Sequence, residues 1–223
     1  VISACYSRIF CVQSAAVCAY NKNEEERRGA SQAEWAKASV PLVRNEADFS
    51  TNGSVHMEYT HLGRSGLLVS KLCLGTMAFG NSCDEKEAHR IMDAALDAGI
   101  NFFDSADNYG KATNNEGITE KIIGRWFKQG GGRRERVVLT TKVHEEMHNP
   151  YDGPNSPGGL SAYKVRRHLR ESMERLQTDH VELYFMHHID RTTSWEEMWD
   201  VFEQLYRDGL IDYVGTSNHP AWY

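Results

Sequence analysis

Three residues with chemically useful side chains stand at the ends of three consecutive strand-like segments. Asp104, Lys142 and His187 each close a short run of apolar and β-branched residues. A carboxylate, an amine and an imidazole can together hold charge and move protons. The matching positions of these three residues make the strand ends the first candidate for a reactive site.

Side-chain alternation predicts that the three residues share one face of a sheet. Successive side chains of a strand point to opposite faces, so Asp104 lies with Phe102 and His187 with Phe185. Neighbouring strands lie about 4.8 Å apart, which would place Lys142, on the middle strand, at ion-pair distance between Asp104 and His187. Such pairing offsets part of the cost of burying an ammonium and a carboxylate.

Tyr109 follows Asp104 closely and can loop back to the same place. A tyrosine hydroxyl beside a lysine ammonium is a sensible general acid, because the positive charge favours the phenolate. We expect Lys142 to tune Tyr109, and Asp104 to hold Lys142 charged and oriented. His187 would bind the substrate oxygen or help to relay a proton. Such a set polarises a carbonyl but supplies no hydride, so a reduction would need a nicotinamide cofactor.

The same residues have plainer interpretations. Asp104 and Lys142 could form a structural ion pair, and a single histidine such as His187 is often a core residue. A metal site near His187, His188 and Asp190 is a further alternative. Alternation directs His188 to the face opposite His187, however, and the sequence has no HExxH spacing, so we expect no metal.

Composition limits the class of protein. The chain has 223 residues, of which 40% are hydrophobic and 25% charged, enough for one sizeable core or two small ones. A net charge of −6 and the lack of a long basic block make nucleic acid an unexpected partner. No run of about 20 apolar residues predicts a membrane span. The five cysteines form no CxxC pair, and Cys73 lies in an apolar run, as expected of a reduced thiol in a cytoplasmic protein.

The first 56 residues differ in character from the rest. Residues 19–56 are polar without a sustained period, so we expect 1–56 to be a poorly ordered extension, possibly not native, before a patterned region 57–223. Residues 1–18 are apolar and lack acids, which could indicate a targeting segment. Because Met57 is the first methionine, we favour upstream sequence translated ahead of a start at Met57.

From residue 59 onward the pattern is regular. A β-hairpin is expected over 59–69, with Gly63 and Gly66 in its turn. It is followed by strands that alternate with helices, the strands over 71–76, 100–106, 137–143, 181–187 and 213–218 and the helices over 84–98, 116–128, 161–176 and 194–207. Strict alternation of this kind indicates a parallel sheet covered by helices.

Two architectures fit that alternation, a doubly wound open sheet and a (β/α)8 barrel. A dinucleotide-binding open sheet should show G-x-G-x-x-G directly after its first strand. Residues 75–80 lack that spacing. In a barrel, reactive residues gather at the carboxyl ends of the strands, where Asp104, Lys142 and His187 stand, so we favour the barrel.

Five ordered segments carry a resemblance to a known family. They look like successive strand-end signatures of the aldo-keto reductases, namely Gly75-Thr76-Met77, residues 101–106 with Tyr109-Gly110, Thr141-Lys142, residues 183–187 and residues 214–218. The resemblance spans residues 57–223. Any one segment would be a weak signal, but five in order, each at the end of its own strand, are specific.

The resemblance implies both an activity and a catalytic set. The family's tetrad of Asp, Tyr, Lys and His corresponds to Asp104, Tyr109, Lys142 and His187. Members of the family transfer a hydride from NADPH to an aldehyde or ketone, and the tyrosine protonates the developing alkoxide. The substrate implied for this chain is therefore a small carbonyl compound.

The resemblance also implies a cofactor site. It places Thr76 and Met77 near the nicotinamide ribose and Ser217 and Asn218 at the nicotinamide carboxamide, with Asp104 also at the cofactor. Ser217 and Asn218 have donors and acceptors suited to an amide. Alternatively, Ser217 and Asn218 could cap the next element.

The chain departs from the family in its number of strands. A barrel of this type has eight, and only about five β/α units are evident, so we expect an incomplete TIM barrel with an N-terminal β-hairpin. The edge strands 71–76 and 213–218 would then be unpaired. Besides the enzyme, two alternatives stay open. One is a cofactor-binding regulatory subunit resembling potassium-channel β subunits, and the other is an inactive truncated fragment.

Overall fold

The structure is a computed structural model that describes residues 10–13, 57–148, 151 and 153–219. Strands and α-helices alternate through most of it: β1 Phe10–Gln13, β2 Tyr59–His61, β3 Leu68–Ser70, β4 Leu72–Gly75, α3 Glu85–Asp97, β5 Phe102–Asp104, α4 Ile118–Phe127, β6 Val138–Val143, α5 Ala162–Leu176, β7 Val181–Met186, α6 Trp195–Arg207 and β8 Ile211–Thr216. Short 3-10 helices occupy Lys111–Thr113, Arg134–Arg136 and Gly153–Asn155.

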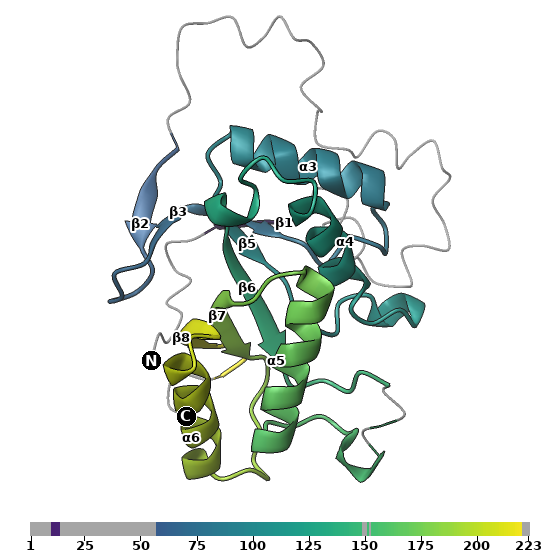
Figure 1. Cartoon of the computed structure of the whole chain (residues 1–223), viewed down its shortest axis with the longest axis vertical. Coiled ribbons are helices and arrows are strands. Elements are labelled where there is room, and N and C mark those ends of the chain that lie inside the picture. The colour runs from purple at the N-terminus through teal and green to yellow at the C-terminus, as the bar shows by residue number, and fades with distance from the viewer. Residues whose placement is uncertain (1–9, 14–56, 149–150, 152, 220–223) are drawn as a thin grey trace, which may run out of the picture.

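The main sheet is parallel, with the strand order β1-β4-β5-β6-β7-β8. Strands β4 to β8 therefore lie side by side in chain order, each joined to the next through a helix. Figure 1 shows α4, α5 and α6 arranged in turn around the curved sheet. This topology confirms the α/β prediction and corresponds to part of a (β/α)8 barrel.

The prediction that both edge strands of the sheet are unpaired is wrong for one of them. β1 pairs in parallel with β4, with Phe10 opposite Leu72 and Gln13 opposite Gly75, so the edge of β4 is occupied. β8, by contrast, pairs within the described part of the chain only with β7. The rest of the predicted extension over residues 1–56 lies outside the described residues.

The hydrophobic core forms two layers because the strand residues alternate between faces. An outer layer fills the space between the sheet and the helices and includes Phe103, Trp126 and Tyr184. An inner layer lies on the other face, and its buried members are Leu62, Val69, Cys73, Phe102, Leu183 and Phe185. The hairpin of β2 and β3 supplies part of this inner layer, and the predicted hairpin is confirmed.

Local signals in the sequence set the helix boundaries. The side chains of Asp84, Ser161 and Ser194 each accept a hydrogen bond from the backbone N–H three residues on, as N-cap residues do. Helices α3 and α6 end just before Gly99 and Gly209, whose φ angles are 84° and 70°. The short, capped helices return the chain to the sheet at a regular interval, which brings the strand ends to one edge.

Helices α4 and α5 approach each other closely. A Cβ atom at Gly124, within α4, would lie 2.2 Å from the carbonyl oxygen of Arg175 in α5. A side chain larger than hydrogen therefore cannot occupy this position without moving one of the helices.

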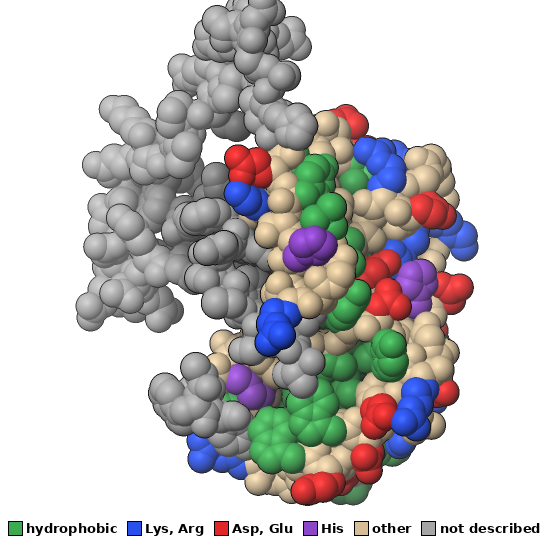
Figure 2. All heavy atoms as spheres, turned by 90° about the vertical axis from the view of Figure 1, so that its left-hand side faces the viewer, with side chains coloured by type: hydrophobic (Ala, Val, Ile, Leu, Met, Phe, Trp, Pro, Cys, Tyr) green, Lys and Arg blue, Asp and Glu red, His purple; other side chains and the backbone are tan. Residues whose placement is uncertain are grey.

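The surface seen in Figure 2, from the left-hand side of Figure 1, is mixed, with hydrophobic side chains exposed between acidic and basic ones.

Candidate active site

Lys142 is the centre of the predicted site. Its Nζ atom donates to Asp104 Oδ2 at 2.8 Å, to the carbonyl oxygen of Ser105 at 2.7 Å and to the Tyr109 hydroxyl at 3.2 Å. An ammonium has three donors, and these three acceptors hold it in one place. The Lys142 side chain is 5% exposed and that of Asp104 is 15% exposed, so water screens the pair weakly.

Asp104 is held on its other side as well. The hydroxyl of Thr140 donates to Asp104 Oδ1 at 2.8 Å, and the parallel register places these two residues opposite each other. Both carboxylate oxygens are therefore engaged. Thr140 precedes Lys142 by two residues in β6, so alternation along the strand directs both to the inner face; this spacing is the signal in the sequence that could identify Thr140.

His187 completes the set from the end of β7. The centroids of its ring and the Tyr109 ring are 6.3 Å apart, in an edge arrangement. Burial, and then the positive charge of Lys142, lower the pKa of His187 from 6.5 to about 3. At neutral pH the imidazole is therefore uncharged. Its Nδ1 atom is buried with no hydrogen-bond partner among the described residues.

Thr76 and Met77, both predicted at the cofactor, follow β4 directly. The Thr76 hydroxyl is buried and donates to the carbonyl oxygen of Asp104 at 2.8 Å, which ties the end of β4 to the end of β5. Met77 is among the exposed large hydrophobic residues. It therefore offers an apolar surface at the edge where the tetrad lies.

Ser217 and Asn218 lie just beyond β8, beside the end of β7. The side-chain amide of Asn218 donates to the carbonyl oxygen of His187 at 2.9 Å and to Ser217 Oγ at 3.1 Å. Asn218 has a φ of 57°, in the left-handed region, which asparagine tolerates better than most residues. Both N–H groups of the Asn218 amide therefore donate within the protein, which leaves Asn218 Oδ1 as an acceptor and the Ser217 hydroxyl as a donor beside the backbone of His187.

The histidines beside the tetrad correct one prediction. We expected His188 to point away from His187, but the two ring centroids are 4.9 Å apart. The reason is that β7 ends at Met186, so strand alternation does not extend to His188. Its Nε2 atom lies 3.4 Å from Glu145 Oε1, which is 3.2 Å from His144 Nδ1.

The described residues show neither a metal centre nor a membrane-spanning helix. Within residues 10–13, 57–148, 151 and 153–219, no group of three or more His, Cys, Asp or Glu side chains is arranged to hold a metal ion. In the same part of the chain, none of the helices combines the length and apolar character that crossing a membrane requires.

Comparison with known proteins gives a consistent result. The model of the Aldo/keto reductase family matches residues 71–223. A Bacillus subtilis (strain 168) protein described as an uncharacterized oxidoreductase is 62% identical over 167 residues, which cover 75% of this chain and 51% of that protein. A probable voltage-gated potassium channel subunit beta of Oryza sativa subsp. japonica is 39% identical, over 74% of this chain and 48% of its own length.

A solved structure shares the fold. An aldo-keto reductase from Bacillus halodurans, in its holo form, superposes with a TM-score of 0.62 at 35% sequence identity, and the match covers 73% of this chain and 51% of that one. The chain spans about half the length of the curated relatives it matches.

Proposed function

The chain belongs to the aldo/keto reductase family, and we propose that it carries the catalytic tetrad of an oxidoreductase that reduces aldehydes or ketones with NADPH. One observation carries the proposal. The ammonium of Lys142 contacts both the Asp104 carboxylate and the Tyr109 hydroxyl. A phenol held against a fixed, buried ammonium is suited to give its proton to a carbonyl oxygen that is becoming an alkoxide.

Each residue of the tetrad has a separate task in this mechanism. Tyr109 donates its proton to the substrate oxygen, and Lys142, 3.2 Å away, stabilises the phenolate that remains. Asp104 keeps the ammonium in position. His187, neutral because of its low pKa, can donate a hydrogen bond to the carbonyl oxygen without placing a second cation in the site.

NADPH, when bound, supplies the hydride that the side chains lack. The residues proposed to hold its nicotinamide end are Met77, Ser217 and Asn218, with Thr76 and Asp104 beneath them. In support, Asn218 Oδ1 is an acceptor and the Ser217 hydroxyl a donor next to the His187 backbone, as a carboxamide needs one of each. The buried Thr76 fixes the strand ends below.

The test uses this chain joined to the remaining part of the Bacillus subtilis relative, which is 62% identical to this chain over the 167 residues that they share. With NADPH and a panel of aldehydes and ketones, this joined protein should consume NADPH. Tyr109→Phe should reduce the rate by at least about 100-fold. Tyr206→Phe, at an exposed tyrosine, is the matched control and should change nothing. The proposal fails if no carbonyl compound is turned over.

A second candidate function is a regulatory subunit that binds the cofactor without needing turnover. The relative described as a probable potassium channel subunit beta favours it. The joined protein separates the two candidates, because a regulatory subunit would bind NADPH with negligible consumption on any carbonyl compound. The intact set of Asp104, Tyr109, Lys142 and His187 favours the enzyme.

A further inference from the structure

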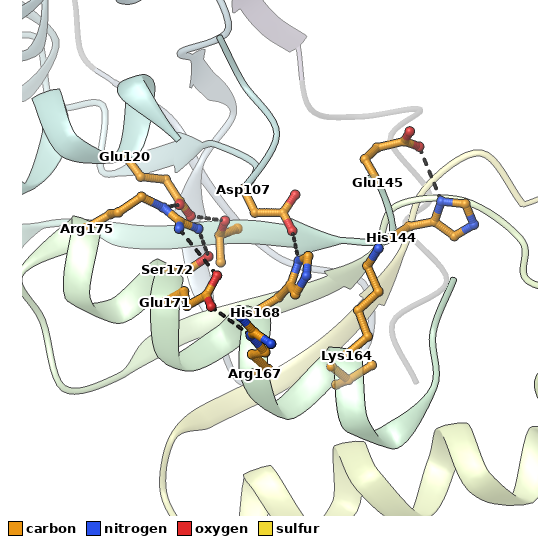
Figure 3. Close-up of polar contacts among 12 residues, drawn as sticks. Asp107, Glu120, His144, Glu145, Lys164, Arg167, His168, Glu171, Ser172 and Arg175 are labelled. Atoms are coloured by element: carbon orange, nitrogen blue, oxygen red, sulfur yellow. Dashed lines mark hydrogen bonds and ion pairs between the residues drawn. The ribbon is translucent and has the colours of Figure 1, made fainter. Parts of the chain in front are cut away.

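A second group of polar side chains lies behind the tetrad, between the sheet and helices α4 and α5. Figure 3 shows its members pointing toward one another from α4, α5 and the ends of the strands. Glu120 accepts from the Thr141 hydroxyl at 2.6 Å and from Arg175 Nε at 2.7 Å. We call this group, which comprises Asp107, Glu120, Thr141, His168 and Arg175, the outer network. It includes Thr141, the immediate neighbour of Lys142.

One pair of this outer network lies behind the loop that carries Tyr109. His168 Nδ1, from α5, is 2.8 Å from Asp107 Oδ2, and the two side chains are 1% and 0% exposed. Asp107 stands between Asp104 and Tyr109 in the sequence. Figure 3 shows its carboxylate directed at the ring of His168, which lies on α5.

Asp107 connects the loop to the scaffold in two directions. Its backbone N–H donates to the carbonyl oxygen of Lys142 at 3.2 Å, and its side chain contacts α5 through His168. Two further main-chain bonds at Tyr109, from Tyr109 N to the Ala106 oxygen and from Gly117 N to the Tyr109 oxygen, stay within the loop. Asp107 therefore fixes the loop against both β6 and α5.

Burying the polar pair of Asp107 and His168 costs more free energy than burying an apolar pair, which indicates a role other than filling space. Complete burial raises the pKa of Asp107, and the hydrogen bond from His168 opposes that rise. A buried carboxylate is expensive unless it is paired, and an apolar pair could fill the same space at lower cost. A directional contact, unlike an apolar one, sets the position of the loop to within a fraction of an ångström.

We propose that Asp107 and His168 form a positioning pair that holds the Tyr109 hydroxyl at hydrogen-bonding distance from Lys142. The inference rests on the proposed function, because Tyr109 is taken as the proton donor. Neither residue of the pair touches the reacting atoms; the pair acts through the loop. A misplacement of the donor by about 1 Å can cost on the order of 100-fold in rate.

The kinetic test compares variants of the joined protein. Asp107→Ala and His168→Ala should each lower kcat by roughly 10- to 100-fold with little change in the KM for NADPH, because the cofactor contacts are elsewhere. The double variant should be little worse than either single one, since both changes break the same contact. His168→Asn should recover much of the rate, because its amide can donate from near the position of Nδ1.

The matched control is Glu182→Ala. Glu182 is also a mostly buried carboxylate in the sheet, 2.8 Å from Arg134 and accepting from the Leu139 N–H at 2.8 Å, but it lies near the start of β7, at the opposite end from the tetrad. It should lower stability and leave kcat unchanged. Equal kcat losses in Asp107→Ala and Glu182→Ala, or no recovery in His168→Asn, would overturn the positioning role.

Hydrogen exchange in the 223-residue chain gives a readout that needs no turnover. Asp107→Ala should accelerate exchange of the backbone amide at position 107 and of the Tyr109 and Gly117 amides, whereas Glu182→Ala should not. If the alanine variant does not fold, His168→Asn can be compared with Asp107→Leu. The asparagine at 168 keeps a donor for Asp107 and should keep the protection, whereas leucine has a shape similar to aspartate but no acceptor and should lose it. Unchanged protection in every Asp107 and His168 variant refutes the pair, whereas inactivity of the wild-type joined protein refutes only the proposed function.

Discussion

Replacing His187 by Gln should change how the stability of the chain depends on pH. In the folded chain, burial and the charge of Lys142 lower the pKa of His187 from 6.5 to about 3. As pH falls below about 6.5, the unfolded chain takes up a proton that the folded chain refuses, so the free energy of unfolding decreases. The decrease continues until the pH reaches about 3.

The size of the effect follows from the two pKa values. One pKa unit corresponds to about 1.4 kcal/mol. Between about pH 7 and pH 4.5, His187 should remove about 2.5 kcal/mol from the free energy of unfolding of the wild-type chain. The Gln variant lacks this contribution. The free energy of unfolding of the variant, relative to that of the wild-type, should therefore rise by that amount over the same interval. The carboxylates are common to both proteins and cancel in this difference.

Urea unfolding of both proteins at a series of pH values measures this difference. Leu68→Gln, which places a glutamine at an exposed position of β3 without removing a titratable group, is the control and should run parallel to the wild-type. An NMR titration of the His187 ring gives a direct second measurement. Parallel curves for wild-type and His187→Gln, or a ring that titrates near pH 6.5, would refute the reasoning about burial and the lysine charge.

Three further predictions concern stability and binding. Lys142→Met should lower the free energy of unfolding, measured in urea, by about 3–5 kcal/mol, because a buried carboxylate loses its partner. The control Lys71→Met, at an exposed ion pair, should lower it by less than about 1 kcal/mol. Similar losses in the two variants would contradict the stronger coupling of the buried ion pair. Gly124→Ala should cost about 3 kcal/mol by the same measurement, since its Cβ would meet the Arg175 oxygen, whereas Gly66→Ala, with open space around it, should stay within about 0.5 kcal/mol. The 223-residue chain alone should bind NADPH weakly, because it spans about half the length of its relatives; tight stoichiometric quenching of its tryptophan fluorescence would show otherwise.

The inner side of the site could be predicted because it depends on local rules. Alternation along a strand and matching strand ends bring Asp104 and Lys142 together, as in the structure. Tyr109 reaches them from the loop that follows β5, as its closeness to Asp104 in the sequence allows. The failure at His188 has the same origin. Alternation holds only while the backbone is extended, and the sequence does not show that β7 stops at Met186.

The outer side of the site could not be predicted because it depends on contacts between distant segments. Asp107 and His168 are 61 residues apart in the chain, and no local pattern links them. The pairing of β1 with β4 is of the same kind, since Phe10 and Leu72 are paired in the sheet although 62 positions separate them in the sequence. Buried polar contacts and edge pairings between remote segments require the packed fold.

The opposite directions of Thr141 and Lys142 restrict how the length of β6 can vary. Thr141 bonds to Glu120 in the helix layer, while Lys142 bonds to Asp104 in the inner layer. Inserting or deleting a single residue before Thr140 would exchange these faces, so the ammonium would enter the helix layer and the tetrad would be lost. Length differences among homologues should therefore be confined to the connections. One such place is the turn at Gly130, where nothing lies within 4 Å of an added Cβ atom.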